Sequence, residues 1–173
     1  ASDVTNIHLA YLAAGSHIIL TNSFGGNPSR LKLHGLANRL HELNSAAAHN
    51  ALQASRETES DSLVAGSIGP TGELLEPYGE LTFKQAKQGF ADQARALEQG
   101  GVDLFWVETM SDINEVLAAV EGIQTVSDKP ITATMTYDRH GRTMMGVSPK
   151  DALEQLAPSG ISALGANCGT GPE

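Results

Sequence analysis

The sequence contains a single cysteine, Cys168, among 173 residues, and only 5% of its residues are aromatic. One cysteine cannot form an intramolecular disulfide, so the chain is not a small secreted scaffold held together by disulfides. It also cannot supply a cysteine-rich zinc site by itself, because such a site takes about four protein ligands.

Basic residues are also scarce: 11 Lys and Arg stand against 20 Asp and Glu, which gives a formal net charge of -9. Proteins that bind nucleic acids neutralise phosphates with clustered Lys and Arg, so we expect no nucleic-acid partner. The sequence has no apolar run of the roughly 20 residues that a membrane span requires, and no signal-peptide pattern at its start. We therefore expect a cytoplasmic globular protein that is one domain or part of one. The oligomeric state stays open.

Short apolar runs alternate with helical patterns along the whole chain. The runs are too short for helices and predict five buried strands, at residues 17–20, 63–65, 102–107, 131–135 and 161–164. The helical patterns cover residues 2–14, 38–56, 81–99, 112–125 and 149–156. This alternation predicts an α/β fold of right-handed βαβ units, which fits a doubly wound sheet or a (β/α)8 TIM barrel.

Two features favour the barrel. Polar or reactive residues follow each predicted strand, as in barrels whose βα loops build one site. The chain also begins with a helical pattern and shows five strands, whereas a full barrel has roughly 250 residues and eight strands. We expect residues 1–173 to form a single incomplete barrel domain without the first and last strands. Its two open sheet edges would be an aggregation hazard.

Local signals define several helix ends. Thr82 and Gln85 have the spacing of a capping box, in which two side chains satisfy free backbone N–H groups. The pair at residues 100–101 is a glycine stop. Ser148 followed by Pro149 predicts a helix start.

The third strand ends at a carboxylate. Glu108 follows Trp106 and Val107, where a charge is costly to bury without a partner, so Glu108 is the leading candidate for ligand binding. Alternatively, Glu108 caps the next helix or pairs with a neighbouring strand, although Ser111 or Asp112 is the better cap.

Two other strand ends carry candidate residues. Thr21 and Asn22 offer hydrogen-bonding groups after the first strand; the alternative is a plain turn capped by Asn27. Cys168 follows the fifth strand in a glycine-rich loop, where a thiol is a candidate nucleophile or metal ligand. Free cysteines are also common as small buried apolar residues. The glycine-rich loop after the second strand matches neither phosphate-binding glycine motif, which disfavours a nucleotide site.

Four ordered motifs carry a resemblance to a known family. They are T-N-S-F-G-G-N at 21–27, G-S-I-G-P-T-G-E-L at 66–74, E-T-M-S-D at 108–112 and G-A-N-C-G-T-G-P at 165–172. Together they resemble the homocysteine-binding, zinc-dependent S-methyltransferases. That family includes betaine–homocysteine methyltransferases and the homocysteine module of cobalamin-dependent methionine synthases.

The resemblance implies a barrel whose mouth holds Zn²⁺ on three cysteine thiolates, with the sulfur of homocysteine as a further ligand. It implies that Cys168 is the first of the three ligands and therefore catalytic. Glu108 would hold the amino group of homocysteine, and Thr21 and Asn22 would lie near this substrate. Asn167 would orient the Cys168 loop from behind.

The chain also departs from the family pattern. The adjacent cysteine pair that completes the zinc site has no match here, so we expect this chain alone to be inactive. The resemblance leaves the methyl donor open; betaine is our expectation, and a methionine synthase module is the alternative. A catalytically dead segment that serves as a binding or assembly surface, or a barrel enzyme that uses Cys168 without metal, are further alternatives.

Overall fold

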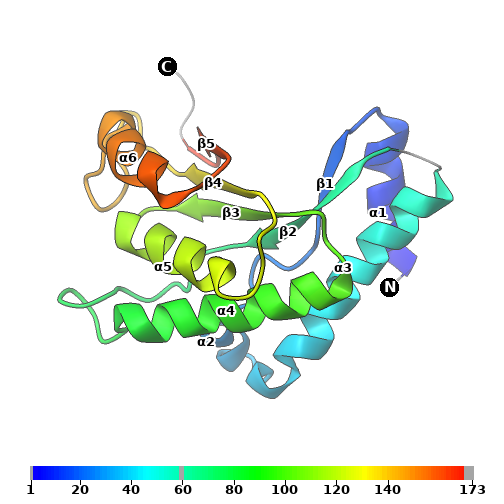
Figure 1. Cartoon of the computed structure of the whole chain (residues 1–173), viewed down its shortest axis with the longest axis horizontal. Helices are drawn as coiled ribbons and strands as arrows, with labels where there is room; N and C mark the ends of the chain where they lie inside the picture. Colours follow the sequence, from blue (N-terminus) through cyan, green and yellow to red (C-terminus); the bar gives the residue numbers. More distant parts are fainter. Residues whose placement is uncertain (1, 59–60, 170–173) are drawn as a thin grey trace.

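The computed structural model describes residues 2–58 and 61–169 and contains one parallel sheet (Figure 1). Its strands are β1 (Ile18–Leu20), β2 (Leu63–Ile68), β3 (Leu104–Met110), β4 (Ile131–Met135) and β5 (Ala163–Ala166). They pair in the order β1-β2-β3-β4-β5, and every pair is parallel. Each βα unit thus adds a strand on the same side of the previous one. A doubly wound sheet reverses this direction at a switch point, whereas a barrel does not, so the sheet is part of a barrel.

The main helices are α1 (Ser2–Ala13), α3 (Leu40–Glu57), α4 (Phe83–Gly100), α5 (Ile113–Gln124) and α6 (Pro149–Leu156). Helices α3, α4 and α5 lie side by side along one face of the sheet (Figure 1). The core fills the space between this face and the helices, and its largest fully buried side chains include Phe90, Leu97 and Phe105. None of the helices in the described part of the chain has the length and hydrophobicity of a membrane-spanning segment.

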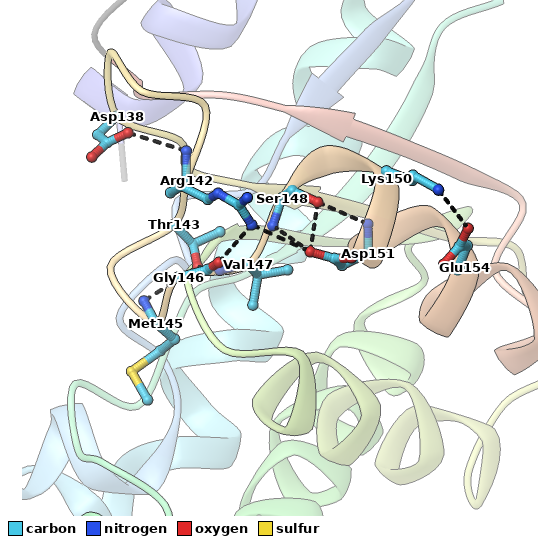
Figure 2. Close-up of polar contacts among 10 residues, drawn as sticks. All are labelled: Asp138, Arg142, Thr143, Met145, Gly146, Val147, Ser148, Lys150, Asp151 and Glu154. Atoms are coloured by element: carbon cyan, nitrogen blue, oxygen red, sulfur yellow. Dashed lines mark hydrogen bonds and ion pairs between the residues drawn. The ribbon is translucent and has the colours of Figure 1, made fainter.

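The predicted helix ends are confirmed. Thr82 and Gln85 form a capping box, and Gly101 ends α4 in the left-handed conformation at a φ of 95°. Asp112 caps α5 by accepting a hydrogen bond from the backbone N–H of Asn114. Ser148 forms a second capping box at the start of α6 (Figure 2). These predictions succeed because a cap is satisfied within one helical turn.

Figure 2 also shows how the loop before α6 is held. The carboxylate of Asp138 accepts hydrogen bonds from the backbone N–H of Arg142, which Figure 2 draws, and from that of His140. Both bonds lower the pKa of this exposed carboxyl group. Arg142 donates to the Gly146 carbonyl oxygen and reaches Asp151 at 3.5 Å. Asp138, Arg139, His140 and Arg142 are exposed, so this loop is a solvated turn.

Two short helical segments were not predicted: α2 (Pro28–Lys32) and η2 (Ala157–Ser159). The start of the helix predicted at residues 38–56 forms the separate short segment η1 (Ala37–Arg39). None is long enough to show a helical repeat of apolar residues. Asn27 caps α2 by accepting from the backbone N–H of Arg30, so the turn considered as an alternative at this strand end is present.

Three strand ends differ from the prediction. Strand β2 continues through Gly66, Ser67 and Ile68, β3 continues past Glu108 to Met110, and β5 ends at Ala166 and not at residue 164. The prediction ended these strands before Gly66, Glu108 and Gly165, since glycine and charged residues are less common in strands. In the sheet, Gly66 packs closely beneath α4: a Cβ there would lie 3.1 Å from the Leu97 side chain. Glu108 therefore lies within a strand and not after it.

Candidate functional site

Polar side chains gather at the carboxyl ends of the strands. In parallel strands these ends share one edge of the sheet, which is where barrel enzymes place their sites. Side chains alternate between the two faces along a strand, so Glu108 lies on the face that carries Trp106 and not on the core face of Phe105 and Val107.

Glu108 has a direct partner on the neighbouring strand. The hydroxyl of Ser67 in β2 donates to Oε1 of Glu108 at 2.5 Å, and Glu108 itself is half-buried. The pairing of β3 with β4 shifts register between Val107 and Met110, next to this carboxylate. Glu108 does not cap α5, because Asp112 does so.

Thr21 and Asn22 differ in exposure. Thr21 is 3% exposed, and its hydroxyl lies 2.6 Å from the Ser23 hydroxyl and accepts from the backbone N–H of Ser67. Asn22 is exposed and lines a cavity of about 530 Å³ between α1 and β1. The structure thus joins Thr21 to Glu108 through Ser67, and this network does not include Asn22.

Asn167 connects three strand ends. Its Oδ1 accepts from the Thr109 backbone N–H at 3.0 Å and from the Thr134 hydroxyl at 2.9 Å. Its Nδ2 donates to the Thr109 hydroxyl at 2.8 Å and contacts Sγ of Cys168 at 3.4 Å. Its carbonyl oxygen accepts from the Thr136 hydroxyl. Asn167 therefore fixes the backbone next to Glu108 and touches the thiol of Cys168.

Two residues at this edge have strained backbones. Thr109 has a φ of 63° and Cys168 a φ of 52°, in the left-handed region that side chains other than glycine rarely adopt. Such strain persists where surrounding contacts hold it, and it clusters at functional sites. The hydrogen bonds of Asn167 supply those contacts for Thr109. Cys168 is exposed, so it is not the small buried apolar residue considered as an alternative.

Sequence reasoning missed Ser67 and Glu115. Ser67 was assigned to the loop after the second strand. Glu115 lies in the first turn of α5, where neighbouring polar residues indicate an exposed side chain. Glu115 is only 5% exposed and accepts from both the backbone N–H and the hydroxyl of Thr71. Burial raises the pKa of the Glu115 carboxyl group, and the hydrogen bonds from Thr71 partly oppose this rise. This carboxylate holds the loop that follows β2.

The donors present fit one ligand of a zinc site. Cys168 offers an exposed thiol at the edge of the sheet. Within residues 2–58 and 61–169, no group of three or more His, Cys, Asp or Glu side chains could hold a metal ion. Residues 170–172 of the last sequence motif lie outside the described residues.

Comparisons with known proteins bear on this arrangement. Residues 2–173 match the model of a family described as homocysteine S-methyltransferase. The chain is 30% identical to the methionine synthase of Mycobacterium tuberculosis over 174 residues, and 29% identical to that of Mycobacterium leprae. Each match covers 96% of this chain but 14% of the synthase.

Solved structures show the same fold. The metallated form of the homocysteine methyltransferase MmuM from Escherichia coli superposes with a TM-score of 0.82 at 24% identity, over 95% of this chain and 62% of that one. Its oxidised form gives a TM-score of 0.79 at 26% identity, over 95% and 61%. The chain spans about two thirds of these enzymes at most and a small part of the synthases. With its family match over residues 2–173 and its partial barrel, this chain belongs to the homocysteine S-methyltransferase family.

Proposed function

We propose that this chain is the homocysteine-binding part of a zinc-dependent homocysteine S-methyltransferase, which transfers a methyl group to the thiol of homocysteine and yields methionine. One observation carries the proposal: Asn167 links the backbone beside the Glu108 carboxylate to the Cys168 thiol, at one edge of the sheet. The backbone N–H of Thr109, next to Glu108, donates to Asn167, and Asn167 contacts Sγ of Cys168. A carboxylate can bind the ammonium group of an amino acid, and a thiolate can hold a metal ion that binds its sulfur.

Glu108 recognises the ammonium group of homocysteine in this proposal. A hydrogen bond between an ammonium and a carboxylate is charge-assisted and about twice as strong as a neutral one. The Ser67 hydroxyl already donates to Oε1, which holds the carboxylate in one orientation. Asn22, exposed after β1, is available to the same end of the substrate.

Cys168 supplies one ligand to Zn²⁺, and the remaining thiolates come from residues outside this chain. Zinc, when bound, deprotonates a coordinated thiol that would otherwise titrate near pH 8.5. This gives homocysteine a nucleophilic sulfur at neutral pH. The exposed thiol of Cys168 also favours the cytoplasm, where free thiols stay reduced.

The methyl donor is a small activated molecule. Our sequence-based expectation is betaine. The identity of 30% to a methionine synthase favours a second candidate, the homocysteine module of a cobalamin-linked synthase. Assays of the whole protein with betaine and with a methylated cobalamin as competing donors separate the two candidates.

The test of the function uses the whole protein that contains this chain. We expect one zinc per barrel and methylation of homocysteine, and we expect Cys168→Ala to abolish both. Lys150→Ala, at an exposed position of α6, is the control and should change neither. Retained zinc and activity in Cys168→Ala would refute the assignment. A whole protein without zinc or activity would support the alternative of a catalytically dead barrel segment.

A further inference from the structure

Three hydroxyl-bearing residues link the ends of β1 and β2. Ser67 donates its backbone N–H to Oγ1 of Thr21 at 3.0 Å. The Thr21 and Ser23 hydroxyl oxygens lie 2.6 Å apart, and Ser23 donates its hydroxyl hydrogen to the Ser67 carbonyl oxygen at 2.7 Å. The three residues are 2–4% exposed. These contacts close a ring that begins and ends on the backbone of Ser67.

The direction of each hydrogen in the ring follows by elimination. A carbonyl oxygen accepts only, so the single hydroxyl hydrogen of Ser23 points to Ser67. Thr21 must then be the donor in its contact with Ser23. Since Thr21 accepts from the Ser67 N–H and spends its hydrogen on Ser23, its hydroxyl has no hydrogen left for a substrate.

The ring leaves the side chain of Ser67 for Glu108. Both backbone groups of Ser67 are engaged, by Thr21 and Ser23, and its hydroxyl donates to Oε1 of Glu108. Chains of buried hydrogen bonds strengthen one another in surroundings of low polarity. The hydroxyl of Ser67 is therefore aimed at one oxygen of the carboxylate by contacts that lie behind it.

Two buried amides support the ring from the helix side. Nε2 of Gln93 in α4 donates to the Ser23 carbonyl oxygen at 2.8 Å. Nδ2 of Asn44 in α3 donates to the Gly26 carbonyl oxygen at 2.9 Å. Gln93 and Asn44 are 0–1% exposed, so the loop after β1 is held from beneath by two groups that solvent does not reach.

We propose that Ser67, held by Thr21 and Ser23, is a positioning residue that orients Glu108 to receive the amino group of homocysteine. Thr21 then acts through Ser67 and does not touch the substrate. This inference rests on the proposed function. The family resemblance gives Ser67 no role and places Thr21 near the substrate, whereas here both residues serve to position Glu108.

The test measures homocysteine kinetics in the whole protein with Ser67→Ala. We expect the KM for homocysteine to rise about tenfold, with kcat nearly unchanged, since a hydrogen bond to a charged group is lost. The inhibition constant of 4-mercaptobutanoate, which is homocysteine without its amino group, should stay within about twofold of the unaltered protein. Only the loss of a residue that acts through the ammonium site should weaken binding of homocysteine and leave binding of 4-mercaptobutanoate unchanged.

Further variants test the ring. Thr21→Val keeps the shape of the side chain and removes its oxygen, so it should raise the KM for homocysteine. Thr21→Ser keeps the hydroxyl and should leave this KM near that of the unaltered protein. Ser45→Ala is the matched control, because it removes a serine hydrogen bond to the Ala96 carbonyl oxygen elsewhere in the fold and should leave both constants unchanged.

Three results would overturn the inference. Ser67→Ala could leave the KM unchanged, or it could weaken homocysteine and 4-mercaptobutanoate equally, which would indicate a general structural loss. An unaltered protein that does not methylate homocysteine would overturn the proposed function and this role together. The first two results leave the proposed function intact.

Discussion

Replacement of Asn167 separates its two tasks, which are to support the strand ends and to contact the proposed zinc ligand. Asn167→Asp keeps an oxygen that accepts from the Thr109 N–H and the Thr134 hydroxyl, and it loses the Nδ2 donor that faces Sγ of Cys168. It also places a negative charge next to the thiolate. Asn167→Ala removes all side-chain contacts but adds no charge.

The expected size follows from the exposure of the site. Two like charges about 4 Å apart repel by about 1 kcal/mol in water and about 4 kcal/mol near a protein surface. Cys168 is exposed, so the lower value applies, and about 1 kcal/mol corresponds to about a fivefold loss of zinc affinity for Asn167→Asp. Asn167→Ala should lose about threefold in zinc affinity, but about 2 kcal/mol in the free energy of unfolding, because it leaves the Thr109 N–H without its acceptor.

Two assays check this, both on the whole protein that contains this chain. Zinc affinity is measured by competition with a chromogenic chelator, and stability by urea unfolding. Zinc affinity should fall in the order wild type, Ala, Asp, whereas stability should fall in the order wild type, Asp, Ala. The same order in both assays would mean that zinc loss merely reflects unfolding, and an Asp variant with unchanged zinc affinity would refute the proximity of Asn167 to the metal.

Two further predictions concern stability. Glu115→Gln keeps the acceptor for Thr71 and removes the buried charge. Burial raises the pKa of Glu115, so the folded protein holds this proton more tightly than the unfolded chain does. The wild type should therefore lose stability relative to this variant as the pH rises above about 4.5, the ordinary pKa of a glutamate; a pH-independent difference would contradict this. Gly26→Ala should destabilise by at least about 2 kcal/mol in thermal unfolding, because its Cβ would lie 2.3 Å from Oδ1 of Asn44, whereas Gly25→Ala, with 3.9 Å to the nearest atom, should be nearly neutral. Equal effects of the two glycine variants would refute the packing argument.

The sequence predicted the order of the elements and the local stops. The alternation of apolar runs with helical patterns is confirmed by five parallel strands and the helices between them. The capping box at Thr82 and the cap at Ser148 are also confirmed. These features depend on residues within a few positions of one another, so a single sequence contains all the information they need.

Site residues were predicted less completely. Glu108, Asn167 and Cys168 were identified by their polar or reactive groups at strand ends, and by the motifs around them. The structure shows which side chains they contact, while their roles with zinc and homocysteine stay predictions. Ser67 was not identified, since a serine beside glycines resembles an ordinary turn.

By itself, the sequence determined the α/β class, the helix caps and a cysteine and a carboxylate at strand ends. Only the tertiary structure decided that Ser67 meets Thr21 across 46 positions and Glu108 across 41. The physical reason is the register of the parallel sheet. Which polar side chains face one another depends on where each strand pairs with the next and on which face it turns inward, and no spacing along the chain fixes either.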